Sequence, residues 1–217
     1  MTLKSKAFDF HSKFVIALDG PAASGKGTVG KLLSNRLNLS YFQSSIVYRS
    51  LALACIKNSI DISDTKAVVN LSKSLELSQD TEALQSESIG SVASKIAAIP
   101  EVRDNLGVHL KRIIETTPRI LMEGRDIGSV IAPNADLKLF IKADVAIRAK
   151  RRYKELLDRG EESSYDRVLE QLILRDDRDT TRSSGPLVLP PDALEIDTSY
   201  LAPEEVLEKI FEVILAR

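Results

Sequence analysis

A glycine-rich segment near the N-terminus, Gly20 to Thr28, constrains the fold of this chain more than any other feature. It reads Gly-Pro-Ala-Ala-Ser-Gly-Lys-Gly-Thr. A short, partly β-branched apolar run, Phe14 to Leu18, precedes it, as expected for a buried parallel strand. Val29 to Leu37 follows, with leucines at helical spacing. A strand, a glycine-rich turn and a helix in this order are the context in which such a pattern predicts a phosphate-binding loop.

The residue types of this segment explain how it would hold a phosphate. Glycines allow backbone conformations that are closed to other residues, and they let N–H groups approach an anion. The helix that begins near Lys26 adds its positive N-terminal dipole. Lys26 can reach the β- and γ-phosphates of a nucleotide, and the Thr28 hydroxyl is a candidate ligand for Mg²⁺. The predicted nucleotide-binding residues are Gly20, Pro21, Ala22, Ala23, Ser24, Gly25, Lys26, Gly27 and Thr28.

Composition narrows the class of protein. The chain has 217 residues, and its 30 basic and 31 acidic side chains nearly cancel, so no basic field suggests a nucleic acid polymer or a membrane surface as partner. A single cysteine, Cys55, excludes an internal disulfide framework and favours a cytoplasmic protein. No run approaches the ~20 apolar residues that span a bilayer. Residues 1–13 lack the features of a signal peptide and are predicted to be a flexible tail.

Strand-like and helix-like segments alternate along most of the chain. This alternation predicts an α/β fold of the P-loop NTPase type, with a five-stranded parallel sheet covered by helices on both faces. Between Asn58 and Pro100 the pattern is helical and serine-rich, which indicates an inserted subdomain. A helix is expected from Pro203. The predicted strands are 14–18, 39–42, 119–123, 137–141 and 193–196.

Charged residues follow two of these strands. Arg49 lies early in a helix, which Ser45 is expected to cap, after the second strand. Arg125 and Asp126 stand between Gly124 and Gly128 in a loop after the third strand. Ligands of open parallel sheets bind at the carboxyl ends of strands, so these side chains are placed to meet a polar or anionic ligand.

Two helices near the C-terminus carry dense charge. Asp144 is expected to cap a basic helix ending at Gly160, whose cationic side chains are predicted to be mostly solvated, with one or two reaching phosphate. In the next helix, Tyr165 to Arg182, one flank carries Arg175, Arg178, Asp179 and Arg182. On its own, an alternation of acidic and basic residues along a helix is typical of surface ion pairs. Beside a phosphate loop it favours arginines that neutralise a transferring phosphoryl group.

Together these segments resemble a bacterial-type cytidylate kinase of the nucleoside monophosphate kinase family. The resemblance includes the Gly-Lys-Gly-Thr variant of the phosphate loop and extends over nearly all of the chain after residue 13. It implies a transferase of pyrimidine metabolism that moves the γ-phosphoryl group of ATP, with Mg²⁺, to CMP or dCMP, giving CDP or dCDP and ADP. The segments that carry it are Gly20 to Thr28, Ser44 to Arg49, Ala93 to Arg103, Gly124 to Gly128 and Arg175 to Arg182.

The resemblance assigns a role to each polar residue that it matches. Lys26, Arg175 and Arg182 would be catalytic, the two arginines moving with a lid. Substrate contacts would come from Ser94, Arg103 and Asp126 at the cytosine edge, Arg49 and Arg125 at the acceptor phosphate, Ser44 and Asp179 at the sugar or phosphate, and Arg175 and Arg182 at the transferring group.

The resemblance also divides the chain. A single kinase domain, 14–217, would follow the tail, with a core made of 14–57, 101–160 and 186–217, an inserted monophosphate-binding subdomain at about 58–100 and a lid at about 161–185. The protein is expected to be a monomer. Gln43 and Ser45 stand where the family often has Asp and Gly, and the insertion is shorter than in many relatives.

Two alternatives are retained. A kinase of the same fold would act on UMP or another small acceptor, because the hydrogen-bonding edges of uracil and cytosine differ only subtly. A P-loop nucleotide switch is the other, although the guanine-specific Asn-Lys-x-Asp pattern is absent and the Asp-x-x-Gly segment, 104–107, falls within a predicted helix.

Overall fold

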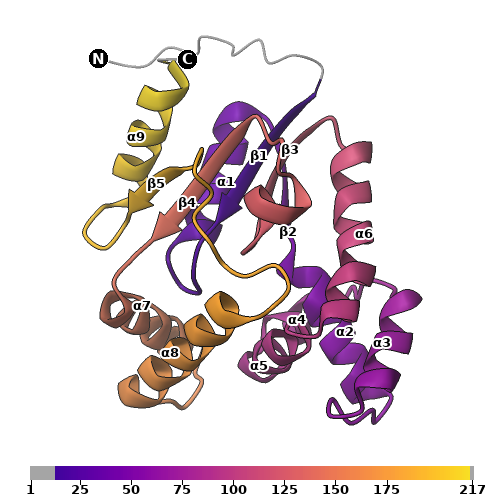
Figure 1. The fold of residues 1–217 in the computed structure, drawn as a ribbon. Coiled ribbons are helices and arrows are strands. Elements are labelled where there is room, and N and C mark those ends of the chain that lie inside the picture. The colour runs from indigo at the N-terminus through magenta and orange to yellow at the C-terminus, as the bar shows by residue number, and fades with distance from the viewer. Residues whose placement is uncertain (1–12, 216–217) are drawn as a thin grey trace.

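The computed structural model describes residues 13–215, so most of the predicted tail lies outside the described residues. A five-stranded sheet forms the centre of the molecule, in the order β2-β3-β1-β4-β5 (Figure 1). Every adjacent pair of strands is parallel, which confirms the predicted α/β fold. The strands are β1 Phe14–Asp19, β2 Ser40–Gln43, β3 Arg119–Glu123, β4 Leu137–Lys142 and β5 Leu194–Asp197.

Where the sequence predicted the end of a helix, the observed end lies within two residues of it. Asp144 caps its helix as predicted, because its carboxylate accepts a hydrogen bond of 2.8 Å from the Ala146 N–H. The predicted cap at Ser45 is wrong: the helix already includes Ser45, and the preceding Ser44 makes no side-chain cap bond. The helices are α1 Lys26–Leu37, α2 Ser45–Lys57, α3 Thr65–Lys73, α4 Thr81–Gln85, α5 Glu87–Ile96, α6 Pro100–Thr116, α7 Val145–Asp158, α8 Tyr165–Thr181 and α9 Pro203–Leu215.

Strand β1 is buried on both faces, and its side chains alternate between two hydrophobic cores. Val15 and Ala17 pack into the core formed with α2, α3, α5 and α6. Ile16 and Leu18 pack on the other face, against α1 and α9. A strand that is buried on both sides explains the continuous apolar run before the glycine-rich turn.

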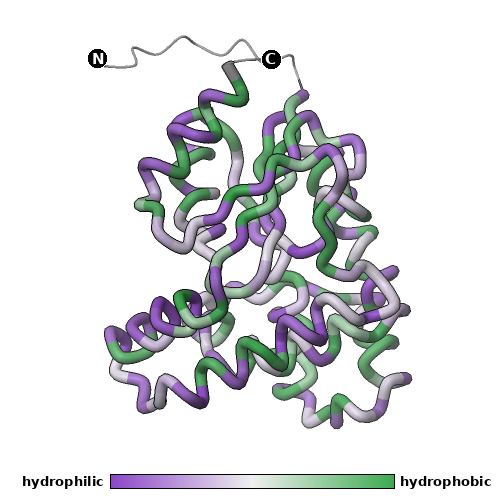
Figure 2. Tube along the Cα trace, turned by 60° about the vertical axis from the view of Figure 1, so that its left-hand side comes forward, coloured by the Kyte–Doolittle hydropathy of each residue, from purple (hydrophilic) through white to green (hydrophobic). Residues whose placement is uncertain are grey.

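Two groups of helices lie beyond the carboxyl ends of the strands (Figure 1). On one side α3, α4 and α5 form the predicted insertion, which is helical throughout its described elements. On the other side α7 and α8 pack together around a small core that includes Ala22, Leu156 and Leu172. Hydrophilic and hydrophobic residues alternate along these helices (Figure 2). Across residues 13–215, no helix is both long and apolar enough to traverse a lipid bilayer.

The segment after β3 was predicted to be a loop, but only its first part is irregular. A single π-helical turn, η1 (Ile127–Ile131), begins within it. The buried Asp19 carboxylate at the end of β1 accepts hydrogen bonds from the N–H groups of Ile127 (2.9 Å) and Gly128 (2.7 Å). Those bonds tie the turn that carries Arg125 and Asp126 to the central strand.

Candidate active site

The glycine-rich loop adopts a conformation that its residue types require. Gly20 has a φ of 145°, and a Cβ atom there would lie 2.0 Å from the backbone oxygen of Ile141. Gly25 has a φ of 90° and directly precedes α1. In residues 13–215 the backbone N–H groups of residues 22–25 donate to no protein acceptor. The loop therefore presents free donors at a helix N-terminus, the arrangement that binds phosphate.

Lys26 lies within this loop rather than on the surface, with 3% of its area exposed. Its ammonium group donates to the Pro21 carbonyl (2.5 Å) and to Ser24 Oγ (3.3 Å). Burial, followed by the positive charges of Arg125 and Arg175, lowers the pKa of Lys26 to about 7. Removing a cation from water disfavours its charged form, so an anion bound in the loop would restore the charge.

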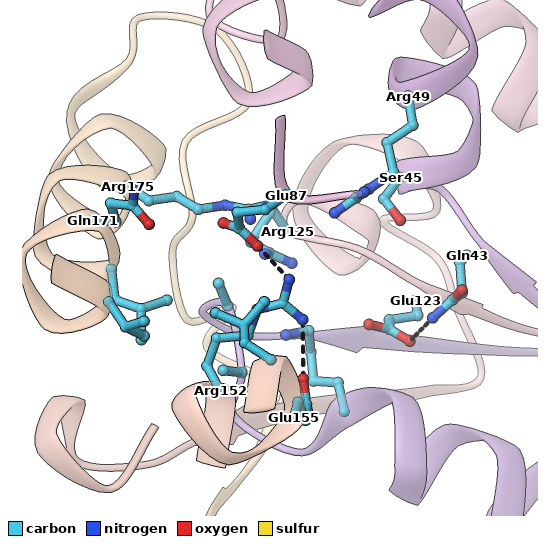
Figure 3. Close-up of a pocket in the computed structure, with 16 residues that line it drawn as sticks. Gln43, Ser45, Arg49, Glu87, Glu123, Arg125, Arg152, Glu155, Gln171 and Arg175 are labelled. Atoms are coloured by element: carbon cyan, nitrogen blue, oxygen red, sulfur yellow. Dashed lines mark hydrogen bonds and ion pairs between the residues drawn. The ribbon is translucent and has the colours of Figure 1, made fainter. Parts of the chain in front are cut away.

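Three cavities meet where the loop faces the carboxyl ends of the strands. The loop cavity lies beside the phosphate loop, and its lining includes Lys26, Thr28 and Thr198. The base cavity lies where the insertion meets the core, and its lining includes Ser94 and Arg103. The central cavity lies between the two and is drawn in Figure 3. Among the described residues, Glu123 alone lines all three cavities.

The base cavity contains a buried ion pair. The Arg103 guanidinium donates to the Asp126 carboxylate, and the side chains are 5% and 6% exposed. Arg103 also donates to the Ala97 carbonyl (3.3 Å), and its guanidinium lies 5.6 Å from the centre of the Tyr48 ring. Pairing and hydrogen bonding are what allow such charges to remain buried. The pair leaves a polar wall in which both donors and acceptors are fixed.

Ser94 also lines the base cavity, and a side chain of helix α8 donates a hydrogen bond to it. The guanidinium of Arg178 on α8 donates to Ser94 Oγ at 2.8 Å. This bond joins the predicted lid to the predicted inserted subdomain. The sequence placed Arg178 on the correct flank of its helix but gave it no role.

A cluster of cations surrounds Asp179 between the base and central cavities. Its carboxylate lies 2.9 Å from Arg125, 3.6 Å from Arg182 and 4.0 Å from Arg175. Burial, followed by the charge of Arg125, lowers the pKa of Arg175 to about 10. The predicted flank of the helix therefore does face the site, and the structure brings its arginines together with the turn after β3.

Arg49 reaches the same space from α2. Its guanidinium donates to the carbonyl of Leu84 in α4 (2.5 Å) and to that of Ser86, which caps α5 (3.1 Å). Gly90 makes room for it, because a Cβ atom there would lie 2.6 Å from Arg49 Nη2. Figure 3 shows Arg49, Arg125 and Arg175 around the central cavity. Ser44 lines the base cavity beside them.

The prediction that the cations of α7 are mostly solvated is wrong for three of five. Arg148 is 4% exposed and donates to the Ala143 and Ala22 carbonyls and to Asp176 (2.6 Å), so it links the phosphate loop to α8. Arg151 and Arg152 line the loop and central cavities. Their guanidinium donors are satisfied by fixed acceptors, which an isolated helical pattern does not reveal. Lys150 and Lys154 are exposed as predicted.

The loop cavity has oxygen donors that suit Mg²⁺. Thr28 and the Glu123 carboxylate both line it, and hydroxyl and carboxylate oxygens are the ligand types that this ion prefers. In the described part of the chain, no three His, Cys, Asp or Glu side chains gather into a metal cage. Such a sparse donor set fits an ion that a nucleotide phosphate brings with it. Sequence reasoning missed Glu123, although it ends a strand two residues before Arg125.

Comparisons with known proteins agree with this geometry. The family model for cytidylate kinase matches residues 16–216. A cytidylate kinase of Rickettsia bellii is 57% identical over 213 residues, 98% of each chain, and one of Rickettsia akari is 56% identical over 96% of this chain and 94% of its own. Among solved structures, a shikimate kinase from Acinetobacter baumannii superposes with a TM-score of 0.51 at 17% identity, covering 97% of both chains. An uncharacterized protein from Eubacterium ventriosum gives 0.57 at 11% identity, over 94% of this chain and 100% of its own.

Proposed function

The chain belongs to the cytidylate kinase family and is an ATP-dependent (d)CMP kinase, and we propose how its side chains divide the work of phosphoryl transfer. One observation carries the proposal: the buried Arg103–Asp126 pair lies on one side of a cluster of arginines, and the phosphate loop lies on the other. A base, its phosphate and a nucleoside triphosphate can then occupy three adjoining cavities.

Base recognition is assigned to Ser94, Arg103 and Asp126. Cytosine offers an amino donor beside ring acceptors, and the paired carboxylate and guanidinium offer the complementary acceptor and donors. A base that mismatches them leaves buried polar groups without partners, which is the costly kind of error.

The acceptor phosphate is assigned to Arg49 and Arg125, and the developing charge of the transferring group to Lys26, Arg175 and Arg182. Arginine suits this task because its planar donors meet phosphate oxygens in pairs. Ser44 and Asp179 are assigned to the sugar or the phosphate. A phosphate oxygen of CMP is already anionic near pH 7, so positioning and charge stabilisation suffice without a general base.

Mg²⁺ would be held by the Thr28 hydroxyl, with the Glu123 carboxylate nearby in the loop cavity. When bound, the ion neutralises phosphate charge and orients the triphosphate. The residues of the chain do the rest: the loop N–H groups and Lys26 grip the donor, and α8 supplies its arginines.

The domain division of the sequence analysis is retained as a proposal. The segment 58–100 would carry the monophosphate, and 161–185 would act as a lid that excludes water from the transferring group. We further expect a cytoplasmic monomer.

A coupled ADP-release assay with ATP, Mg²⁺ and each of CMP, dCMP, UMP and AMP tests the proposal. Rapid turnover is expected with CMP and dCMP only. Comparable turnover with UMP would keep the mechanism but overturn the roles of Ser94, Arg103 and Asp126. Slow ATP hydrolysis that ignores every acceptor would indicate a nucleotide switch.

A further inference from the structure

Glu123 occupies the junction of the three cavities, and two side chains of the neighbouring strand hold it there. Both donate to the same oxygen, Oε2: the Tyr41 hydroxyl and, at 3.2 Å, the Gln43 amide. Gln43 is the β2 partner of Glu123 in the parallel register. No residue of the described chain donates a hydrogen bond to Oε1, and Figure 3 shows the Gln43 contact on one side of the carboxylate only.

Tyr41 owes its position to one glycine of α1, Gly30, and its hydroxyl lies near a second, Gly27. A Cβ atom at Gly30 would lie 2.7 Å from the Tyr41 ring, so only a glycine lets the ring lie against the helix. One turn earlier, a Cβ atom at Gly27 would be 3.8 Å from the Tyr41 hydroxyl and 3.7 Å from Glu123 Oε2. The hydroxyl is thereby directed along the helix toward Glu123, beside the phosphate loop itself.

Tyr41 and Gln43 are chemically suited to hold the Glu123 carboxylate in one orientation. A phenol is neutral near pH 7, so the Tyr41 hydroxyl donates a hydrogen bond to the Glu123 carboxylate without adding charge. Gln43 adds a donor without charge. An acidic residue in its place would set two carboxylates against each other and favour protonation of one of them.

We propose that Tyr41 and Gln43 are positioning residues that hold Glu123 by one oxygen and leave the other for the Mg²⁺ ion of the bound phosphate donor. The inference rests on the proposed function, because it assumes a nucleotide–metal complex in the loop cavity. Partners of a metal-binding carboxylate fix its orientation, and losing one weakens metal binding by about tenfold or more.

The test measures Mn²⁺ affinity by electron paramagnetic resonance in the full chain saturated with a non-hydrolysable ATP analogue. Tyr41→Phe keeps the ring on Gly30 and removes only the hydroxyl. We expect it to weaken Mn²⁺ binding about tenfold, and Glu123→Gln to weaken it at least as much. Gln43→Ala should give a smaller loss, because its bond is longer. Tyr200→Phe, at a side chain that is 87% exposed, is the matched control and should bind as the wild type does.

The decisive comparison is the double variant. If Tyr41 acts only through Glu123, adding Tyr41→Phe to Glu123→Gln changes nothing further. Wild-type Mn²⁺ affinity in Tyr41→Phe would overturn the proposal, as would a Tyr41 effect that persists without the carboxylate. Metal binding is measured without CMP, so its result does not depend on phosphoryl transfer. A failure of the proposed function would be seen separately, as wild-type enzyme that consumes no ATP when CMP is supplied.

Discussion

The Nε atom of Arg125 lies 2.9 Å from Oδ2 of Asp179, and this ion pair joins the turn after β3 to helix α8. The same carboxylate faces Arg175 on its own helix and Arg182 directly after the end of that helix. One acidic side chain thus offsets part of the charge of three arginines where we propose that phosphate binds. Without phosphate, the cluster needs Asp179 to remain assembled.

Asp179→Asn is therefore expected to destabilise the free protein. Burial opposes ionisation of Asp179, but Arg125, Arg175 and Arg182 outweigh it and hold its pKa below its ordinary value of 3.8. A depressed pKa contributes stability that is complete above pH 3.8 and is lost as the pH falls through the lower folded value. At pH 7 the variant should lose about 3 kcal/mol of unfolding free energy, as expected for a broken buried pair.

Urea denaturation at several pH values measures this loss. The difference between wild type and variant should narrow below pH 3.8. Asp177→Asn, at an exposed position two residues earlier on α8, should have little effect at any pH. A difference that is the same at pH 7 and pH 3 would show that the carboxylate charge is not the cause.

Arg182→Ala is expected to reduce turnover far more than ATP affinity. Arg182 donates to the Gly185 carbonyl at 2.7 Å, while its buried Nη2 atom has no hydrogen-bond partner in the described residues. This donor is therefore available to form a hydrogen bond with the negative charge that develops on the phosphoryl group during transfer. We expect kcat to fall on the order of a thousandfold and the Kd for ATP to change by no more than about threefold. Arg167→Ala, exposed at the other end of α8, should retain activity; matching losses of ATP affinity and kcat in Arg182→Ala would contradict the assignment.

The fold could be predicted from sequence because local patterns and tertiary packing agree in the core. The run Phe14 to Leu18 reads as a strand buried on both faces, and it is one. Phe14–Asp19 and Lys26–Leu37 leave only a short turn between them, which fixes the phosphate loop. The carboxyl-end rule for parallel sheets likewise predicts that Arg49 and Arg125 lie near a ligand site, and both line the central cavity.

What the sequence did not show is pairing between segments far apart in the chain. Arg152 reads as a solvated cation until Glu87, 65 residues earlier, is seen to accept its hydrogen bond. Tyr41 and Glu123 are 82 residues apart, and only the β2–β3 register brings them together. No periodic pattern records such contacts, since each depends on which elements become neighbours.

Asp126→Asn should relax the choice of base. The substitution keeps the shape and one carbonyl acceptor but removes the charge that holds Arg103. We expect the ratio of kcat/KM for CMP over UMP to fall by about tenfold or more, because the amide keeps one acceptor oxygen where the carboxylate had two and adds an N–H donor that does not complement the cytosine amino group. Asp104→Asn, exposed on the outer side of α6, is the control. Thermal unfolding verifies that the variant is folded, and an unchanged CMP:UMP ratio in folded protein would contradict the role of Asp126.

Binding of ATP with Mg²⁺ should take up a proton through Lys26. Burial, then Arg125 and Arg175, lowers the pKa of this amine to about 7, with Glu123 and Asp19 opposing. At pH 8 the free enzyme therefore carries Lys26 mostly neutral, whereas the phosphates favour the ammonium form. Linkage predicts uptake of about nine-tenths of a proton at pH 8, and an affinity that falls about tenfold per pH unit above 7. Calorimetry at pH 8 in two buffers of different ionisation enthalpy measures the uptake directly. Lys26→Arg, which stays charged, should bind ATP without proton uptake. If the wild type also binds ATP without proton uptake, Lys26 is already fully charged in the free loop and the prediction is wrong.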